Sequence, residues 1–352
     1  MKTKQRLMAV LALAMLGFSV FGLTACEEKH KHEWNEYVSK QATCTKKGML
    51  VYSCYCGENY TVELPIDSDK HNIVDEACVE CGKKFYSEGL AYELSSDGES
   101  YSVTGIGECT DTEIIIPSKY NGLPVMDIDI GAFSYCYSLT SVTIPDSVTS
   151  IGDTAFWLCK SLTKVTIPDS VTSIGGDLFF GCIRLTSIEV EENNTHYSSL
   201  GGNLYNKDQT QLIQYAIGKT ATSFTIPGSV TCIGYAAFKD STSLTSVIIP
   251  DSVTSIGDWA FCDCSSLTSV TIGDNVTSIG ERAFSGCDSL TSVTIENSVT
   301  SIGESTFYEC TGLTSITFNG TVEEWSAISK GRYWDYYVPA TEVVCTNGRV
   351  SI

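Results

Sequence analysis

The sequence predicts a mainly β solenoid, a stack of similar coils of 23 residues each. A phenylalanine recurs every 23 residues in two runs, Phe133, Phe156 and Phe179, then Phe238, Phe261, Phe284 and Phe307. A phrase of apolar and small residues accompanies it, Leu-x-x-Val-x-Ile-Pro-x-Ser-Val-x-x-Ile-Gly-x-x-Ala-Phe-x-x-Cys. A period of about 20 to 50 residues is typical of stacked units that bury their apolar faces only against their neighbours.

Each coil is expected to hold one strand, one return segment and one short helical turn. In the coil that starts at Leu139, apolar side chains of residues 139–145 point inward along a strand. Pro145 ends this strand because proline has no N–H to continue the ladder. Val148 and Ile151 then point inward from the return segment, and Phe156 packs through a single helical turn.

The array, residues 87–318, is expected to be capped at both ends and interrupted once. Residues 90–103 alternate apolar and polar side chains as an edge strand pair does, which indicates an N-terminal cap. The long interval between Phe179 and Phe238 indicates an insertion, residues 191–222, which we interpret as a hairpin between coils, with an interaction role as the alternative. Aromatic residues in the tail, 319–352, indicate a C-terminal cap or a patch that binds sugars or peptides.

Cysteines recur at one position of the repeat, three residues after the phenylalanine. Six of the 16 cysteines stand there, namely Cys136, Cys159, Cys182, Cys264, Cys287 and Cys310. We interpret them as a ladder of buried free thiols, which pack as small apolar groups. Stacked coils bring equivalent Cα atoms within disulfide reach, so disulfides are the alternative.

Residues 1–26 predict a lipoprotein signal peptide. Lys2, Lys4 and Arg6 precede an apolar stretch that ends at Cys26 and is short for a transmembrane anchor. The run Leu-Thr-Ala-Cys resembles the lipobox of bacterial lipoproteins. This resemblance implies that Cys26 is acylated and tethers the chain to the cell membrane, on its extracytoplasmic face.

Residues 27–86 predict a separate Cys/His-rich module. Its candidate metal ligands are Cys44, Cys54, Cys56, His71, Cys78 and Cys81. Two cysteine-containing turns, each followed by glycine, are similar to the paired knuckles of a zinc ribbon, although one of them has the short spacing Cys-x-Cys. A structural Zn²⁺ ion and a disulfide-stapled mini-domain are both consistent with this pattern.

The repeated phrase resembles the treponemal-type, or BspA-like, leucine-rich repeat over residues 114–318. The N-terminal module resembles small Cys/His repeats that precede solenoids in surface proteins of gut Firmicutes. These resemblances imply a right-handed solenoid in a surface lipoprotein. They also imply a function in adhesion or host binding, because family members with an assigned role are described as adhesins or host-binding proteins.

The residues indicate a binding protein that requires no cofactor and is not an enzyme. The repeats contain a single histidine, His196, and the recurring aspartates after proline are typical of turns, not of acid–base pairs. The net charge of −20 excludes nucleic acid, because an acidic surface repels phosphates. An extracellular protein or glycan is the expected partner, and a structural envelope component or an enzyme on a solenoid scaffold are the alternatives.

The outward side of the strands is the expected binding face. Most outward positions hold serine or threonine. Lys164, Glu189 and Ile248 depart from this pattern near the insertion, and Tyr205 lies within it. We therefore predict these four residues as ligand contacts.

Overall fold

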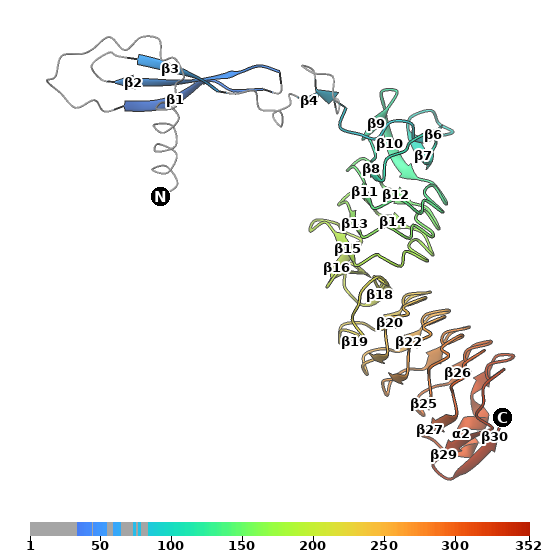
Figure 1. Ribbon diagram of the computed structural model, residues 1–352. Coiled ribbons are helices and arrows are strands. Elements are labelled where there is room, and N and C mark those ends of the chain that lie inside the picture. The colour runs from blue at the N-terminus through green and yellow to red at the C-terminus, as the bar shows by residue number, and fades with distance from the viewer. Residues whose placement is uncertain (1–33, 44, 55–58, 65–72, 75–76, 79–83) are drawn as a thin grey trace. The chain divides into compact units, whose positions relative to one another are not determined.

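The computed structural model describes residues 34–43, 45–54, 59–64, 73–74, 77–78 and 84–352 (Figure 1). The chain divides into two compact units, Met1–Lys84 and Phe85–Ile352. In the first unit, three antiparallel strands lie in the order β1 (Trp34–Lys40), β2 (Gly48–Cys54) and β3 (Asn59–Leu64). β4 (Ile73–Val74) pairs with β5 (Ala77–Cys78). Leu50 and Tyr52 of the central strand are buried.

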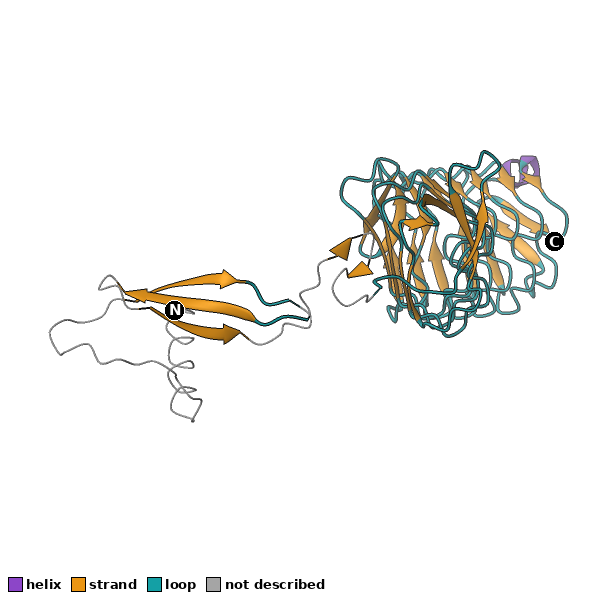
Figure 2. Ribbon diagram, turned by 90° about the horizontal axis from the view of Figure 1, so that it is seen from above, coloured by secondary structure: helices purple, strands orange, loops and turns teal. Residues whose placement is uncertain are grey.

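The second unit is a solenoid, as predicted (Figure 2). Equivalent strands of successive coils pair into sheets on two sides, which we call the front sheet and the return sheet. In its upstream part, the front sheet consists of β8 (Glu113–Ile115), β11 (Ser141–Thr143), β13 (Lys164–Ile167) and β15 (Ser187–Val190). The return sheet consists of β6 (Ala91–Leu94), β7 (Tyr101–Gly105), β10 (Leu123–Ile128), β12 (Ser150–Ile151) and β14 (Ser173–Ile174). β9 (Lys119–Tyr120) pairs with β10, and β6 pairs antiparallel with β7 as the predicted edge strand pair.

The downstream part repeats this arrangement. Its front strands are β19 (Ser223–Thr225), β21 (Ser246–Ile248), β23 (Ser269–Thr271), β25 (Ser292–Ile295), β27 (Ser315–Phe318), β29 (Glu342–Cys345) and β30 (Gly348–Ser351). Its return strands are β18 (Gln211–Gln214), β20 (Cys232–Ile233), β22 (Ser255–Ile256), β24 (Ser278–Ile279), β26 (Ser301–Ile302) and β28 (Ser329–Lys330). Successive return strands pair in parallel register, for example Ile256 with Ile279.

The insertion forms an antiparallel meander between the two stacks of coils. β16 (Tyr197–Leu200) pairs with β17 (Asn203–Asn206), and β17 pairs with β18, which confirms the predicted hairpin. Figure 1 shows these strands between β15 and β20. Because side chains alternate along a strand, Leu204 packs into the upstream core and Tyr205 into the downstream core. The meander therefore separates two hydrophobic cores.

The third side of each coil is a turn edge made of consecutive β-turns instead of the expected helical turn. In the coil of Phe156, the N–H of Trp157 donates to the carbonyl of Thr154 at 2.9 Å, three residues back. Thr154 and Leu158 have φ angles of 54° and 58°, in the left-handed region, so a helix does not continue through them. The N–H of Phe156 turns toward the next coil and donates to the carbonyl of Leu178 at 3.1 Å.

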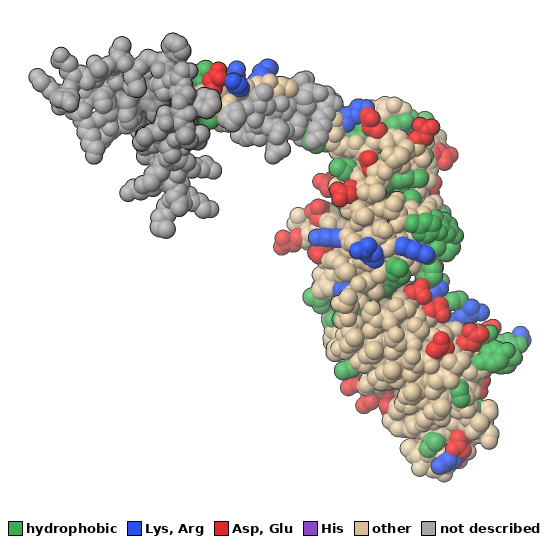
Figure 3. Space-filling view, viewed as in Figure 1, with side chains coloured by type: hydrophobic (Ala, Val, Ile, Leu, Met, Phe, Trp, Pro, Cys, Tyr) green, Lys and Arg blue, Asp and Glu red, His purple; other side chains and the backbone are tan. Residues whose placement is uncertain are grey.

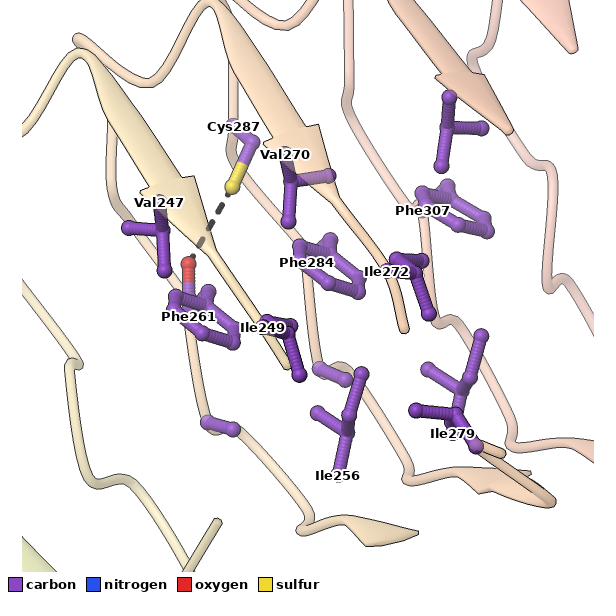
Figure 4. Close-up of a cluster of buried hydrophobic side chains, with 14 of the residues drawn as sticks. Val247, Ile249, Ile256, Phe261, Val270, Ile272, Ile279, Phe284, Cys287 and Phe307 are labelled. Carbon is purple, nitrogen blue, oxygen red and sulfur yellow. Dashed lines mark hydrogen bonds between the residues drawn. The ribbon is translucent and has the colours of Figure 1, made fainter. Parts of the chain in front are cut away.

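The core of each stack contains a column of phenylalanine rings, and Figure 4 shows part of the downstream column. Phe261 is fully buried, with ring centroids 4.7 Å from Phe238 and 5.1 Å from Phe284. The cysteine ladder lies beside this column as free thiols. The Cys287 thiol donates to the carbonyl of Phe261 at 3.2 Å, and the same contact recurs in other coils. The thiols therefore satisfy a carbonyl group of the preceding coil while they fill the core.

The C-terminal tail covers the last coil. α2 (Val322–Ala327) begins with a capping box between Thr321 and Glu324. Trp325 and Trp334 are buried, with their ring centroids 5.6 Å apart, and Trp334 contacts Phe307. These contacts show that the two tryptophans of the tail close the core.

Candidate functional site

Lys164 and Glu189 lie together on the strand face, which we define as the outward side of the front strands. They occupy the neighbouring strands β13 and β15, and Lys164 Nζ lies 3.9 Å from Glu189 Oε1. The hydroxyl of Ser187 donates to the same oxygen at 2.7 Å. Their side chains are 57% and 45% exposed. An ion pair this exposed contributes only about 0–1 kcal/mol to stability, so both groups are available to a ligand.

Ile248 lies on the strand face of the downstream stack, away from the sheet that holds Lys164. Its side chain is 48% exposed, and in register it stands between Thr225 and Thr271. β13 and β15 belong to one front sheet and β21 to another. The structure thus brings Lys164 and Glu189 together but does not pair them with Ile248.

The prediction of Tyr205 as a ligand contact is wrong. Its side chain is fully buried in the downstream core, and its hydroxyl has no hydrogen-bond partner. Burial raises the pKa of this hydroxyl. The error has a physical cause: the predicted hairpin lies between two hydrophobic cores, and Tyr205 packs into the downstream one.

A small cleft opens where the meander joins the coils. Leu212 pairs with Ile233 and the ring of Tyr215 stacks on Phe238, yet only two residues separate Leu212 from Tyr215. A regular coil has four residues at this place, 257–260. This coil is therefore two residues shorter than a regular coil between its return strand and its core aromatic ring. As a result, residues 174–179 of the preceding coil and 234–235 of the following coil line a cleft of about 170 Å³.

Two contacts join the two stacks at this junction, and the first of them crosses the cleft. Tyr235 Oη donates to Asp177 Oδ2 at 3.4 Å, a long hydrogen bond. The Lys239 ammonium lies 4.4 Å from the ring centroid of Phe180. The bridging side chains come from both stacks, so the cleft belongs to the junction and its polar groups are partly engaged.

Exposed aromatic rings gather on the turn edge. Outside the tail, the sequence predicted no site there. Tyr135 contacts Trp157 at 5.0 Å between ring centroids, and Trp157 contacts Phe180 at 5.9 Å. Further along, Lys239 and Arg282 cover the ring of Trp259. Figure 3 shows apolar side chains gathered in groups along one edge of the solenoid. The signal that could have found them is aromatic substitution at variable repeat positions beside the invariant phenylalanine.

A second group of exposed rings, the tyrosine cluster, lies on the turn edge at the C-terminal end. It consists of Tyr308, Tyr333, Tyr336 and Tyr337. Tyr336 is at its centre, with ring centroids 4.3 Å from Tyr337, 5.5 Å from Tyr333 and 6.0 Å from Tyr308. Tyr333, Tyr336 and Tyr337 are 58%, 46% and 60% exposed.

Groups for acid–base catalysis or metal binding do not converge in the part of the chain that the structure describes. His196 is exposed, and its Nδ1 lies 3.0 Å from the hydroxyl of its neighbour Thr195. No group of three or more His, Cys, Asp or Glu residues that could hold a metal occurs among the described residues. Burial raises the pKa of the Cys262 thiol to about 12, with the nearby Asp263 carboxylate adding to the effect. This thiol is therefore a poor nucleophile.

Several predicted site residues lie outside the described residues. These are the lipidation candidate Cys26 and the metal candidates Cys44, Cys56, His71 and Cys81. Cys54 and Cys78 end the strands β2 and β5. In the described ranges, no helix has the length and apolar character needed to cross a membrane.

Comparison with known proteins gives a family match over most of the solenoid. The family model of the BspA type leucine rich repeat region matches residues 126–214 and 214–329, in six copies. No curated protein sequence matches the chain.

The comparison also finds similar solved structures. The pneumococcal vaccine antigen PcpA is 18% identical, with 88% of each chain covered and a TM-score of 0.56. A leucine-rich repeat protein from Bacteroides ovatus is 25% identical, with 75% of this chain and 72% of that chain covered and a TM-score of 0.49. A leucine rich cell surface protein from Faecalibacterium prausnitzii is 24% identical, with 69% and 96% covered and a TM-score of 0.46.

Proposed function

Because the chain belongs to the BspA-type leucine-rich repeat family, we propose that it is a non-enzymatic cell-surface protein that binds an extracellular protein or glycan. The strand face of the solenoid is the binding surface in this proposal. The observation that carries it is the exposed Lys164–Glu189 pair, which interrupts a face otherwise rich in small hydroxyl groups. A charged pair of this kind fixes the register of a partner while it contributes little to folding.

The fold supports a binding role for this surface. In each coil the front strand alternates buried and exposed side chains, as in β13, where Val165 is buried and Lys164 and Thr166 are exposed. The core therefore fixes the backbone, and exposed positions can vary without loss of packing. Rigid elements that carry variable side chains hold a binding surface in place with little ordering cost.

A lipid anchor at Cys26 completes the proposal. The acylated cysteine would hold the chain on the extracytoplasmic face of the cell membrane and leave the solenoid free to meet ligands. A net charge of −20 keeps such a domain away from an anionic envelope surface. The N-terminal module would act as the spacer between anchor and solenoid.

Binding is tested with the purified full-length chain on arrays of extracellular proteins and of glycans. The variant Lys164→Ala/Glu189→Ala should lose at least about tenfold in affinity for the ligand that the wild type captures, equivalent to about 1.4 kcal/mol. The control Thr172→Ala changes an exposed residue that precedes the return strand β14, and should bind as the wild type does. Equal binding by all three proteins would remove the strand face from the proposal.

A further inference from the structure

The tyrosine cluster differs from the other exposed aromatic rings in its charges. Elsewhere on the turn edge, cations of the same chain cover several rings. Lys160 lies 5.3 Å from the Tyr137 centroid, and Lys239 lies 4.5 Å from that of Trp259. Among the residues that the structure describes, no lysine or arginine lies over any ring of the tyrosine cluster. Arg332, which precedes Tyr333 in the chain, makes no such contact either.

A carboxylate adjoins the tyrosine cluster. Glu309 follows Tyr308 in the chain, and its hydrogen bond and negative charge raise the pKa of the Tyr308 hydroxyl. The faces of tyrosine rings and neighbouring carboxylates both attract a cation.

The cluster is not required to close the core. Trp325 and Trp334 cover the last coil, whereas Tyr333, Tyr336 and Tyr337 are about half exposed. Exposed tyrosines in mutual contact offer a large, rigid contact area with little side-chain entropy to lose. The rings of Tyr308, Tyr333 and Tyr337 surround that of Tyr336, and the four rings form a contiguous contact surface.

We propose that the tyrosine cluster is a second binding site, separate from the strand face, that takes a lysine or arginine side chain of a partner protein. The cation would lie over the rings of Tyr336 and Tyr337, in the cluster whose Tyr308 adjoins the Glu309 carboxylate. The net charge of −20 favours this partner, because it steers basic segments toward the chain. Trp259, on the turn edge nearer the N-terminus than the cluster, makes such a cation–π contact within the chain, with Lys239 and Arg282 as its cations.

The test uses a fluorescent peptide of alternating lysine and glycine and the purified full-length chain, at about 0.15 M salt, where long-range attraction is screened. Fluorescence anisotropy should show saturable binding that Tyr336→Leu/Tyr337→Leu weakens about tenfold, since two cation–π contacts are lost. Tyr336→Phe/Tyr337→Phe should retain the binding, because phenylalanine keeps the aromatic face. The matched control Tyr135→Leu/Tyr137→Leu removes two tyrosines of similar exposure upstream and should bind within about twofold of wild type.

Three results would overturn the proposal. Equal losses in the Leu variant and the upstream control would show that net charge alone attracts the peptide. If the wild-type chain is folded, as a thermal melt would show, and the peptide does not bind it saturably, the rings do not hold a cation. Binding of a neutral oligosaccharide that depends on Tyr336 and Tyr337, without lysine-peptide binding, would assign the cluster to glycans instead. None of these results depends on Lys164 or Glu189, so the strand-face proposal stands or fails separately.

Discussion

Replacing Phe261 with alanine should unfold the downstream stack and leave the upstream stack protected. Phe261 is fully buried and its ring stacks against Phe238 and Phe284. Removal of a buried phenylalanine costs about 3–5 kcal/mol through lost burial and the cavity left behind. A loss of about 4 kcal/mol raises the open population of that stack by roughly a thousandfold. The meander separates this core from the upstream core, so the unfolding should stay within the downstream stack.

The ladder cysteines report this opening coil by coil. Cys264 and Cys287 in the downstream core, and Cys159 and Cys182 in the upstream core, are fully buried free thiols, so alkylation requires local unfolding. In Phe261→Ala, mass spectrometry should show much faster alkylation of Cys264 and Cys287, with little change at Cys159 and Cys182.

The matched variant is Phe156→Ala, which removes the equivalent ring of the upstream column. It should give the opposite pattern, with Cys159 and Cys182 labelled first. If either variant speeds the labelling of all four cysteines equally, the two cores form one cooperative unit and the inferred role of the meander is refuted.

Three further predictions test the core and the N-terminus. Tyr215→Phe should leave stability unchanged or raise the unfolding free energy by up to about 1 kcal/mol in a thermal melt, since the Tyr215 hydroxyl is buried without a partner. Burial holds the pKa of Cys264 above its ordinary value of 9.0 and raises that of Cys262 to about 12, so unfolded thiols ionise first above pH 9. Stability contributed by these thiols is complete below that pH and lost as the pH rises above it, which urea unfolding at pH 7 and pH 10 should show as a lower midpoint at pH 10. Cys26→Ser should release the protein from membranes, and equal membrane fractions of variant and wild type would contradict the lipid anchor.

The repeat made the coils predictable from the sequence, because one period sets both the core and the strand register. Phe261 and its equivalents recur at the same position, and each is buried in the column. The hairpin at 203–214 was predictable because two apolar pairs flank a polar turn. The side on which Tyr205 packs was not, since Leu204 and Tyr205 are both apolar and each faces a different core.

The backbone conformation of the turn edge could not be predicted by comparing repeats, because its exposed positions vary from coil to coil. Left-handed φ angles there fall on Trp259 and Arg282, not only on glycine, so the usual sequence signature of such turns is missing. Burial divides the aromatic residues of the tail into two groups with different roles. Trp325 and Trp334 serve the cap, whereas Tyr336 and its neighbours lie at the surface.

Photo-crosslinking tests most directly whether the strand face binds the ligand. A photoreactive amino acid replaces Thr166, which lies on the strand face in register with Glu189, or Thr172, which is exposed just before the return strand β14. With a ligand captured from the arrays, the proposed function predicts a crosslink from position 166 and none from position 172. A crosslink from position 172 alone, or equal crosslinks from both, would contradict binding through the strand face.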